Sequence, residues 1–301
     1  MNLLIQIIPS AIFITFCALP AWLVFKLYDK KIDTKKSPLN IDLLRSPGES
    51  LQEQIDDINR DISLNLLIIP IIPVFIYSVA LSNYFFSTSK TSLFQIISYS
   101  IFIILSTIYF CHSIYKLLNK KNLLRLGLEC EVAVGQDLQN LIRYKFKVYN
   151  DFQTENFNID HIVIGPTGVF AIETKGRSKF AKHENNNWKL EFDGQKLIFP
   201  GWIEAKPVEQ ALRQADWLKN WLRKATAENV NVKPVLAIPG WYITRKAKSN
   251  LLIYNGKNST FLANGDVVLS DKQIQTISFQ IEKECRNISA KSYKKISQPV
   301  N

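Results

Sequence analysis

The sequence has few of the residues that build disulfide frameworks or zinc sites. Its 301 residues include four cysteines and three histidines. Cys17 and Cys111 lie in apolar runs, Cys130 and Cys285 lie far apart in the more polar remainder, and no two cysteines have the Cys-x-x-Cys spacing. This pattern predicts reduced thiols in a protein that faces the cytosol, and the three scattered histidines exclude a zinc site. The sequence also lacks an internal repeat, a Gly-rich phosphate loop and a Ser/His/Asp set.

Charge is unevenly distributed along the chain. Residues 1–118 are almost balanced, whereas residues 119–301 hold 28 basic and 18 acidic residues, a net charge of +10 out of +11 for the whole chain. Such an excess favours polyanions, of which nucleic acid is the usual one. A solvated basic surface, or attraction to anionic lipid, is the alternative interpretation.

Three long apolar runs predict a membrane region in residues 1–118. They cover residues 3–27, 66–86 and 93–118, and each is long enough to span a bilayer as a helix. A cleaved signal peptide is the alternative for the first run, but that run lacks a basic n-region and is long for an h-region. The polar loop 28–65 contains a short helical pattern, in which Leu51, Ile55, Ile58 and Ile62 recur.

Lysines and arginines predict the orientation of these spans. They are frequent in the 28–65 loop and after the third run, whereas the turn between the second and third runs carries Lys90 alone. By the positive-inside rule, the 28–65 loop and the C-terminal domain should be cytoplasmic, with the N-terminus outside.

The stretch 158–176 carries the strongest chemical signal. Two short apolar segments flank Gly165-Pro-Thr-Gly168, a turn sequence that predicts a hairpin with positive φ at Gly168. If Gly165 faces Gly168, Asp160 lies opposite Glu173, and Lys175 points to the same face as Glu173. A bulge would shift this pairing by one residue. Two acids and a lysine around one point suggest a divalent metal site.

These residues resemble the PD-(D/E)xK nuclease signature, in which an Asp is followed on the next strand by Glu-x-Lys. They are more similar still to the nuclease-related domain called NERD. The resemblance covers roughly residues 122–240 and rests on four pieces in order: Gly127-x-x-x-Glu131, Ile159–Val163, Gly168–Lys175 and Lys206–Gln210. Two positions depart from the expected pattern, where Cys130 replaces a glycine and Lys206 replaces a commoner asparagine.

The resemblance implies Mg²⁺-dependent (or Mn²⁺-dependent) hydrolysis of phosphodiester bonds in DNA or RNA. Asp160 and Glu173 would bind the metal with the Thr174 carbonyl, and Glu131 would bind it directly or through water. Lys175 would position the attacking water, and its charge would help to stabilise the pentacovalent phosphate.

Two predicted helices supply the remaining candidate residues of the site. In a helix from Gly127 to Ile142, Glu131 falls within the apolar arc and Glu129 on the polar side; a buried acid there is paired, metal-bound or the sign of a helix register error. A helix from Pro207 to about Lys224 carries a stripe of Gln210, Gln214, Trp217 and Trp221. Gln210 matches the family's glutamine and should lie beside the metal site. The tryptophans either stack on bases, belong to the core or face the membrane.

Together these observations predict three transmembrane helices in 1–118, followed by a cytoplasmic NERD-like nuclease domain in 119–301. By the resemblance, that domain should be a restriction-endonuclease-like α/β fold, a mixed sheet flanked by helices. Further strands are expected over 146–149, 188–192, 196–199, 235–238 and 267–269. A catalytically silent, membrane-tethered module that binds or senses nucleic acid is one alternative function. A scaffold whose basic domain binds lipid headgroups is another.

Overall fold

A computed structural model describes residues 2–86, 92–179 and 188–290 of the chain. These residues form two compact units. One unit combines residues 41–54 with residues of 123–289, and the other takes in the remaining described residues. The predicted turn between the second and third spans, residues 87–92, lies outside the described residues except for Ser92.

Three long helices contain the apolar runs of the sequence. They are α1 (Asn2–Asp33), α2 (Glu49–Phe86) and α3 (Leu93–Leu138). The short helix predicted around Leu51 and the predicted second span are one continuous helix, since α2 runs through both. In the same way, α3 joins the predicted third span to the helix predicted from Gly127.

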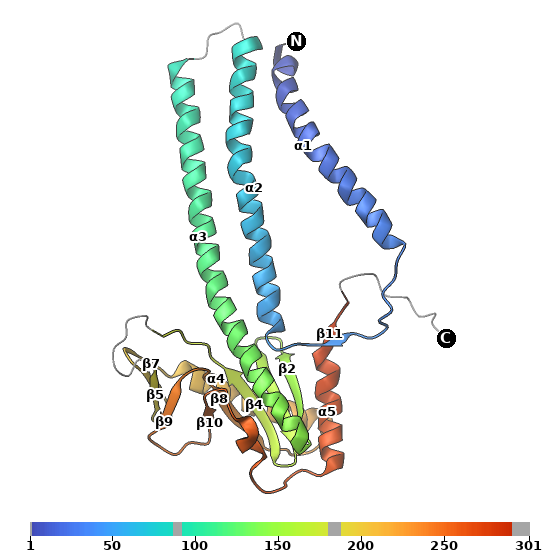
Figure 1. Cartoon of the computed structure of the whole chain (residues 1–301), viewed down its shortest axis with the longest axis vertical. Coiled ribbons are helices and arrows are strands. Elements are labelled where there is room, and N and C mark those ends of the chain that lie inside the picture. The colour runs from blue at the N-terminus through green and yellow to red at the C-terminus, as the bar shows by residue number, and fades with distance from the viewer. Residues whose placement is uncertain (1, 87–91, 180–187, 291–301) are drawn as a thin grey trace. The chain divides into compact units, whose positions relative to one another are not determined.

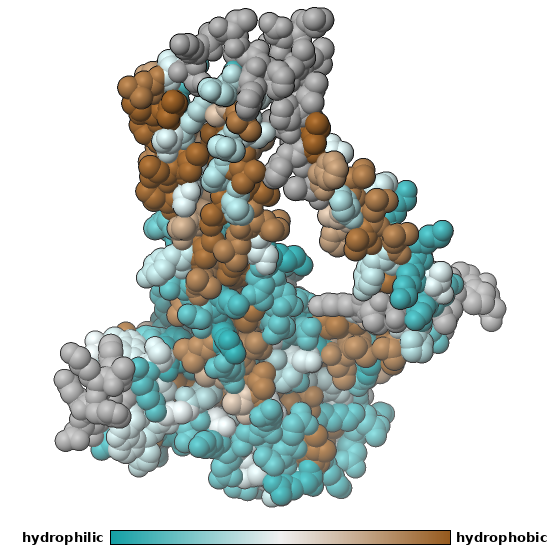
Figure 2. All heavy atoms as spheres, turned by 45° about the horizontal axis from the view of Figure 1, so that its top comes forward, coloured by the Kyte–Doolittle hydropathy of each residue, from teal (hydrophilic) through white to brown (hydrophobic). Residues whose placement is uncertain are grey.

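Two of these helices have the length and composition needed to cross a membrane. Among the described residues, this holds for α2 and for α3. Their apolar side chains are largely exposed, as the brown surface in Figure 2 shows, and they include Leu66, Leu67, Ile71, Phe94, Phe102 and Ile108. The first predicted span lies in α1, whose side chains the structure describes only in part.

The unit formed by residues 41–54 and 123–289 is built on a five-stranded mixed sheet (Figure 1). Its strand order is β10-β8-β4-β3-β2, in which β10, β8 and β4 are parallel and β4, β3 and β2 are antiparallel. The strands are β2 (Lys147–Gln153), β3 (Asn158–Gly165), β4 (Gly168–Thr174), β8 (Val232–Ala237) and β10 (Leu252–Tyr254).

Helices cover both faces of this sheet, as predicted. On one face, α4 (Lys206–Thr226) and α5 (Asp271–Cys285) bury Leu218 and Ile277 against side chains of β2, β3 and β4. On the other face, the last turns of α3 and the 3₁₀ segments η1 (Gln139–Tyr144) and η2 (Ser259–Ala263) pack on Val163, Ile172 and Val235. Because all seven residues of β4 are buried, that strand forms the centre of the core.

Two smaller sheets complete the unit. One has the order β7-β6-β5-β9 and consists of β5 (Lys189–Phe192), β6 (Leu197–Phe199), β7 (Trp202–Glu204) and β9 (Tyr242–Arg245). The other pairs β1 (Leu43–Leu44) with β11 (Arg286–Ile288), so the segment before α2 is joined to the end of the domain.

The prediction of a strand at Val267–Leu269 was wrong. Val267 and Val268 are exposed, and the amides of Val268 and Leu269 both donate to the Pro166 carbonyl, at 2.8 and 3.1 Å. Because both amides donate to the same carbonyl, the segment is held against the β3–β4 turn but does not form the alternating hydrogen bonds of a paired strand.

Candidate functional site

The β3–β4 hairpin has the register that its turn predicts. Gly165 pairs with Gly168, the regular pairing continues to His161 opposite Ile172, and Gly168 has φ +132°. There is therefore no one-residue offset over these pairs. At the open end of the hairpin, the Asp160 Oδ2 atom accepts a hydrogen bond of 2.7 Å from the Thr174 amide. Asp160 and Thr174 are both buried.

Glu173 is held from two sides. Its Oε1 forms an ion pair with the Lys175 ammonium, and its Oε2 accepts a hydrogen bond of 2.6 Å from the Gln214 amide on α4. The glutamate is almost fully buried, whereas the lysine side chain retains 23% of its exposure. Lys175 is therefore the group of this pair that faces solvent.

Glu131 lies on the buried face of α3, as its position in the apolar arc predicts. It is 6% exposed, while Glu129 lies outside and pairs with Arg125. Within the described residues, the Glu131 Oε2 atom has no hydrogen-bond partner. A buried oxygen of this kind is costly unless a proton or a cation accompanies it.

The buried acids influence one another's ionisation. Burial raises the pKa of Glu131 to about 8, and the charges of Asp151 and Glu173 add to this increase, whereas Lys175 opposes it. Burial, followed by the charges of Glu173 and Glu131, also raises the pKa of Asp160. Asp160, Glu173, Lys175 and Glu131 therefore lie close enough to form one electrostatic cluster.

A neighbouring histidine does not neutralise these acids. His161 is fully buried, and burial lowers its pKa to about 3, so its ring is uncharged at neutral pH. Its Nδ1 lies 2.9 Å from the Asn150 Oδ1 atom. Lys175 remains the cation in ion-pair contact with the acidic cluster.

The donor set of the cluster suits a hard cation. It offers carboxylate oxygens, the ligands that Mg²⁺ prefers, and within the described residues the Thr174 Oγ1 and Glu131 Oε2 atoms are buried without a partner. In the described part of the chain, no three His, Cys, Asp or Glu side chains are gathered closely enough to hold a metal ion by themselves. Mg²⁺ usually keeps several waters and needs only one or two carboxylates, so the residues fit such an ion.

The glutamine that contacts the cluster is Gln214. Gln210, the residue indicated by the resemblance, lies one turn earlier on α4 and is half-buried. Gln214 is 2% exposed, and its amide reaches both Glu173 and the Asn158 carbonyl, the latter at 2.9 Å. The sequence placed both glutamines on the same stripe of the helix, and that periodicity was the signal that could have identified Gln214.

The two tryptophans of the stripe belong to the hydrophobic core. Trp217 and Trp221 pack against the cluster of buried residues beneath α4. The ring centroids of Trp221 and Phe152 are 5.2 Å apart, and those of Trp217 and Phe157 are 5.5 Å apart. This packing agrees with the core interpretation of the stripe.

The fold and the cluster together define a mixed α/β domain with a buried, acidic, lysine-containing site. Residues 126–239 match the family model of NERD, described as a nuclease-related domain. This range contains Glu131, Asp160, Glu173, Lys175 and Gln214, and the match indicates a nuclease-related function. Searches of curated proteins and of solved structures gave no match.

The raised pKa of Glu131 predicts a pH dependence of stability. In the unfolded chain this group titrates near 4.5, and in the folded protein near 8. Between these values the folded state binds the extra proton, so stability should fall as pH rises from about 5 to 8. Without divalent metal, Glu131→Gln should remove much of this loss and stabilise the protein at pH 8.5, by an amount on the order of a few kcal/mol.

Thermal unfolding at pH 5 and pH 8.5, in the presence of a chelator, measures this effect. Glu129→Gln is the matched control, because Glu129 is exposed on the same helix. This substitution should change the melting temperature at neither pH. Equal pH profiles for the wild type and Glu131→Gln would show that Glu131 ionises normally.

Proposed function

We propose that the protein is a membrane-anchored, metal-dependent nuclease that hydrolyses phosphodiester bonds of DNA or RNA. The observation that carries this proposal is the buried cluster at the open end of the β3–β4 hairpin, where Asp160 and Glu173 meet Lys175 and Glu131, whose Oε2 atom has no hydrogen-bond partner among the described residues. The match to NERD over residues 126–239 and the Asp…Glu-x-Lys spacing, which resembles PD-(D/E)xK nucleases, both support it.

The metal in this proposal is Mg²⁺ or Mn²⁺. Asp160 and Glu173 would hold it with the Thr174 carbonyl, and Glu131 would join through a water. When bound, the ion supplies Lewis-acid activation of a phosphoryl oxygen and of water. Its charge would also favour ionised forms of Asp160 and Glu131, whose pKa values are raised in its absence.

The protein's own groups would supply orientation and charge. Lys175 is partly exposed beside Glu173, so its ammonium can reach a water on the solvent side of the site. That water would attack phosphorus and lose its proton, while the bond from phosphorus to the leaving oxygen breaks and that oxygen takes up a proton. The ammonium would position the water and stabilise the extra negative charge on the phosphorane.

A module that binds or senses nucleic acid without turnover is the second candidate. It would keep the basic surface but would not need the acids in a metal-binding state. Burial of three carboxylates beside one lysine favours the nuclease, because a binding module gains nothing from so costly an arrangement.

Conservative substitutions of the cluster test the nuclease proposal. Asp160→Asn and Glu173→Gln keep the size of the side chain and one acceptor oxygen but remove an anionic ligand, so each should lower cleavage by at least about 100-fold. Both should keep or raise the melting temperature without metal, since they relieve repulsion between buried charges. Lys175→Ala should retain Mn²⁺ binding and lose turnover.

Cleavage of DNA and RNA by the full-length protein, with and without Mg²⁺ or Mn²⁺, measures the outcome. The full chain is needed because residues 41–54 belong to the same compact unit as the site. Glu129→Gln is the control and should leave activity unchanged. Metal that never raises the wild-type melting temperature, together with unfolding of both acid variants, would make the acids structural.

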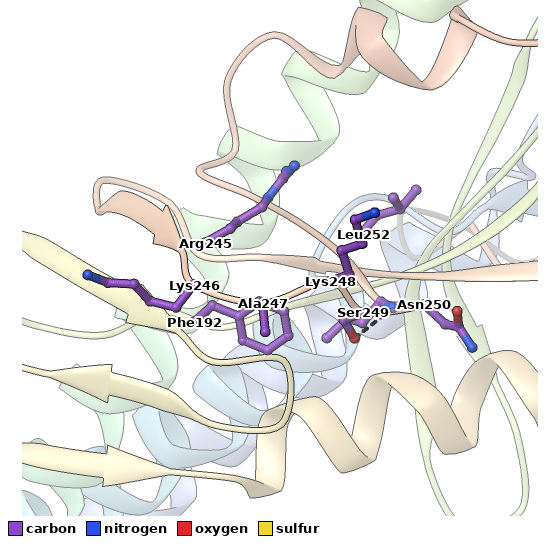
Figure 3. Close-up of a pocket in the computed structure, with 9 residues that line it drawn as sticks. Phe192, Arg245, Lys246, Ala247, Lys248, Ser249, Asn250 and Leu252 are labelled. Atoms are coloured by element: carbon purple, nitrogen blue, oxygen red, sulfur yellow. Dashed lines mark hydrogen bonds between the residues drawn. The ribbon is translucent and has the colours of Figure 1, made fainter.

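Nucleic acid would contact a basic hollow beside the four-stranded sheet β7-β6-β5-β9. Phe192, the end of β9 and the loop that follows it line a hollow of about 750 Å³, to which β9 contributes Arg245 and the loop contributes Lys246 and Lys248 (Figure 3). Lys246 is paired with Glu191 at 3.2 Å, but both side chains are about half-exposed, so this pair leaves the ammonium available. The hollow is therefore suited to the phosphate backbone.

Salt dependence tests this contact. Removing two lysines with Lys246→Gln and Lys248→Gln should reduce the slope of log affinity against log salt by up to about 2, because each phosphate contact releases counterions. The control pair Lys272→Gln and Lys283→Gln, exposed on α5, should change the slope much less. An equal change in both pairs would show that only the overall charge matters.

Membrane anchoring is the remaining part of the proposal. The exposed apolar surfaces of α2 and α3 and the apolar run in α1 support three spans, with the N-terminus outside and the C-terminal domain in the cytoplasm. The lysines after the third run and in the 28–65 loop support this orientation.

Reporter fusions test the orientation. A reporter fused after Asn301 should be active in the cytoplasm, and one inserted at Ser89 should be active on the outer side. Cytoplasmic activity at both positions would contradict the three-span topology, and release of the protein from membranes by carbonate would contradict spanning altogether.

A further inference from the structure

We infer that Asn158 positions both acids of the site, Asp160 and Glu173, and that the segment Arg45–Ser50 in turn fixes the position of the Asn158 side chain through its contacts with Asp151. This inference rests on the proposed nuclease function for its catalytic consequence, but its structural part stands on contacts within one compact unit. The segment lies outside residues 126–239, which match the nuclease-related domain.

Asp151 is the centre of the arrangement. It is fully buried and adopts φ +50°, a left-handed conformation that is uncommon for residues other than glycine. Its carboxylate accepts hydrogen bonds from the Ser50 amide and the Arg45 Nε, both at 2.8 Å, and from the Ser50 hydroxyl at 2.6 Å. Gln153 and Asn158 each donate to it at 2.9 Å. The carboxylate therefore caps the first turn of α2 and fixes the Asn158 side chain at once.

Asn158 connects Asp151 to both acids. Its Nδ2 donates to the Asp151 Oδ1 atom at 2.9 Å and lies 3.4 Å from the Asp160 Oδ1 atom. Its backbone carbonyl accepts from the Gln214 amide at 2.9 Å, and the same amide nitrogen donates to Glu173 at 2.6 Å. One residue therefore orients Asp160 through its side chain and Glu173 through its main chain, which makes it a positioning residue.

The segment before α2 also lies against the helix that carries Glu131. Gly135 has no room for a side chain, since a Cβ there would lie 2.6 Å from the Pro47 Cγ. A Cβ on Gly48 would lie 2.4 Å from a Leu128 methyl and 3.6 Å from the Glu131 Oε2 atom. The turn at Pro47-Gly48 is thus close to the third acid, so the segment touches the surroundings of the site at two separate places.

Arg45 attaches the segment to Asp151 through an ion pair. Its side chain is 7% exposed and forms an ion pair with Asp151 at 2.8 Å, with further contacts to Asn287 at 3.2 Å and Glu53 at 3.5 Å. A buried carboxylate without its cation is strongly unfavourable, so the segment and Asp151 stay together in the folded domain. The positions of Asn158 and of both acids consequently depend on Arg45, which precedes α2, and on Ser50 in the first turn of α2.

The test uses the full-length protein and two variants with matched controls. Asn158→Ala removes the side-chain amide that bridges Asp151 and Asp160. Asn156→Ala is the same change at an exposed position two residues earlier, between β2 and β3. Ser50→Ala removes the hydroxyl that contacts both Asp151 carboxylate oxygens, and Ser63→Ala is its exposed control on α2. Two quantities are measured: site-resolved amide exchange at Thr174 without metal, and the Mn²⁺ concentration at half-maximal cleavage.

Asn158→Ala should accelerate exchange of the Thr174 amide, which donates to Asp160, while the other amides of β4 keep their protection. The Mn²⁺ midpoint should rise by roughly tenfold. The KM for a DNA substrate should stay within twofold. Ser50→Ala should change both quantities in the same direction by a smaller factor, and the two controls should change neither.

The two readouts separate this inference from the proposed function. If the wild type neither binds Mn²⁺ nor cleaves nucleic acid, the nuclease proposal fails, and exchange at Thr174 alone decides whether Asn158 positions Asp160. Unchanged exchange, or faster exchange along the whole of β4, would overturn the inference. In an active protein, an unmoved Mn²⁺ midpoint for Asn158→Ala would overturn it as well.

Discussion

Several carboxylates are buried around one lysine, and the arrangement of the domain follows from the cost of that burial. Asp160 and Glu173 meet at the end of a hairpin whose ladder would otherwise bring two like charges together. The Lys175 ion pair and the amide donors from Thr174 and Gln214 lower the repulsion, and burial together with the neighbouring charges raises the pKa of Asp160. One lysine cannot balance three carboxylates when all are ionised, and a divalent cation would complement the remaining negative charge.

The site draws on elements from both faces of the central sheet. Glu131 comes from α3, whereas Gln214 comes from α4 on the opposite face, and the hairpin between them supplies Asp160 and Glu173. Residues 41–54 add a further support, since Arg45 and Ser50 hold Asp151 and Leu43–Leu44 pair with β11. The compact unit is therefore discontinuous in sequence, and the chain enters α2 directly from a segment attached to the site.

The most local features were the ones that the sequence predicted correctly. Gly165-Pro-Thr-Gly168 defines a tight turn, and the strand pairing continues from it without a bulge, so Asp160 and Glu173 could be placed without tertiary information. Glu131 was found by helical periodicity, because an acid within an apolar arc is conspicuous. Strand β8, rich in apolar residues, was also recognised, although it begins three residues earlier than predicted.

The sequence by itself therefore determined the hairpin, the apolar helices and the basic excess, since each depends on neighbours along the chain. Only the tertiary structure decided the contacts of the site with distant segments. Gln210 and Gln214 lie one turn apart on the same stripe, and only the packing of α4 on the sheet brings Gln214 to Glu173. Val267–Leu269 has the composition of a strand but finds no ladder, because the Pro166 carbonyl takes two of its amides. The link from Arg45 through Asp151 to Asn158 spans more than a hundred residues, and no local pattern in the sequence encodes it.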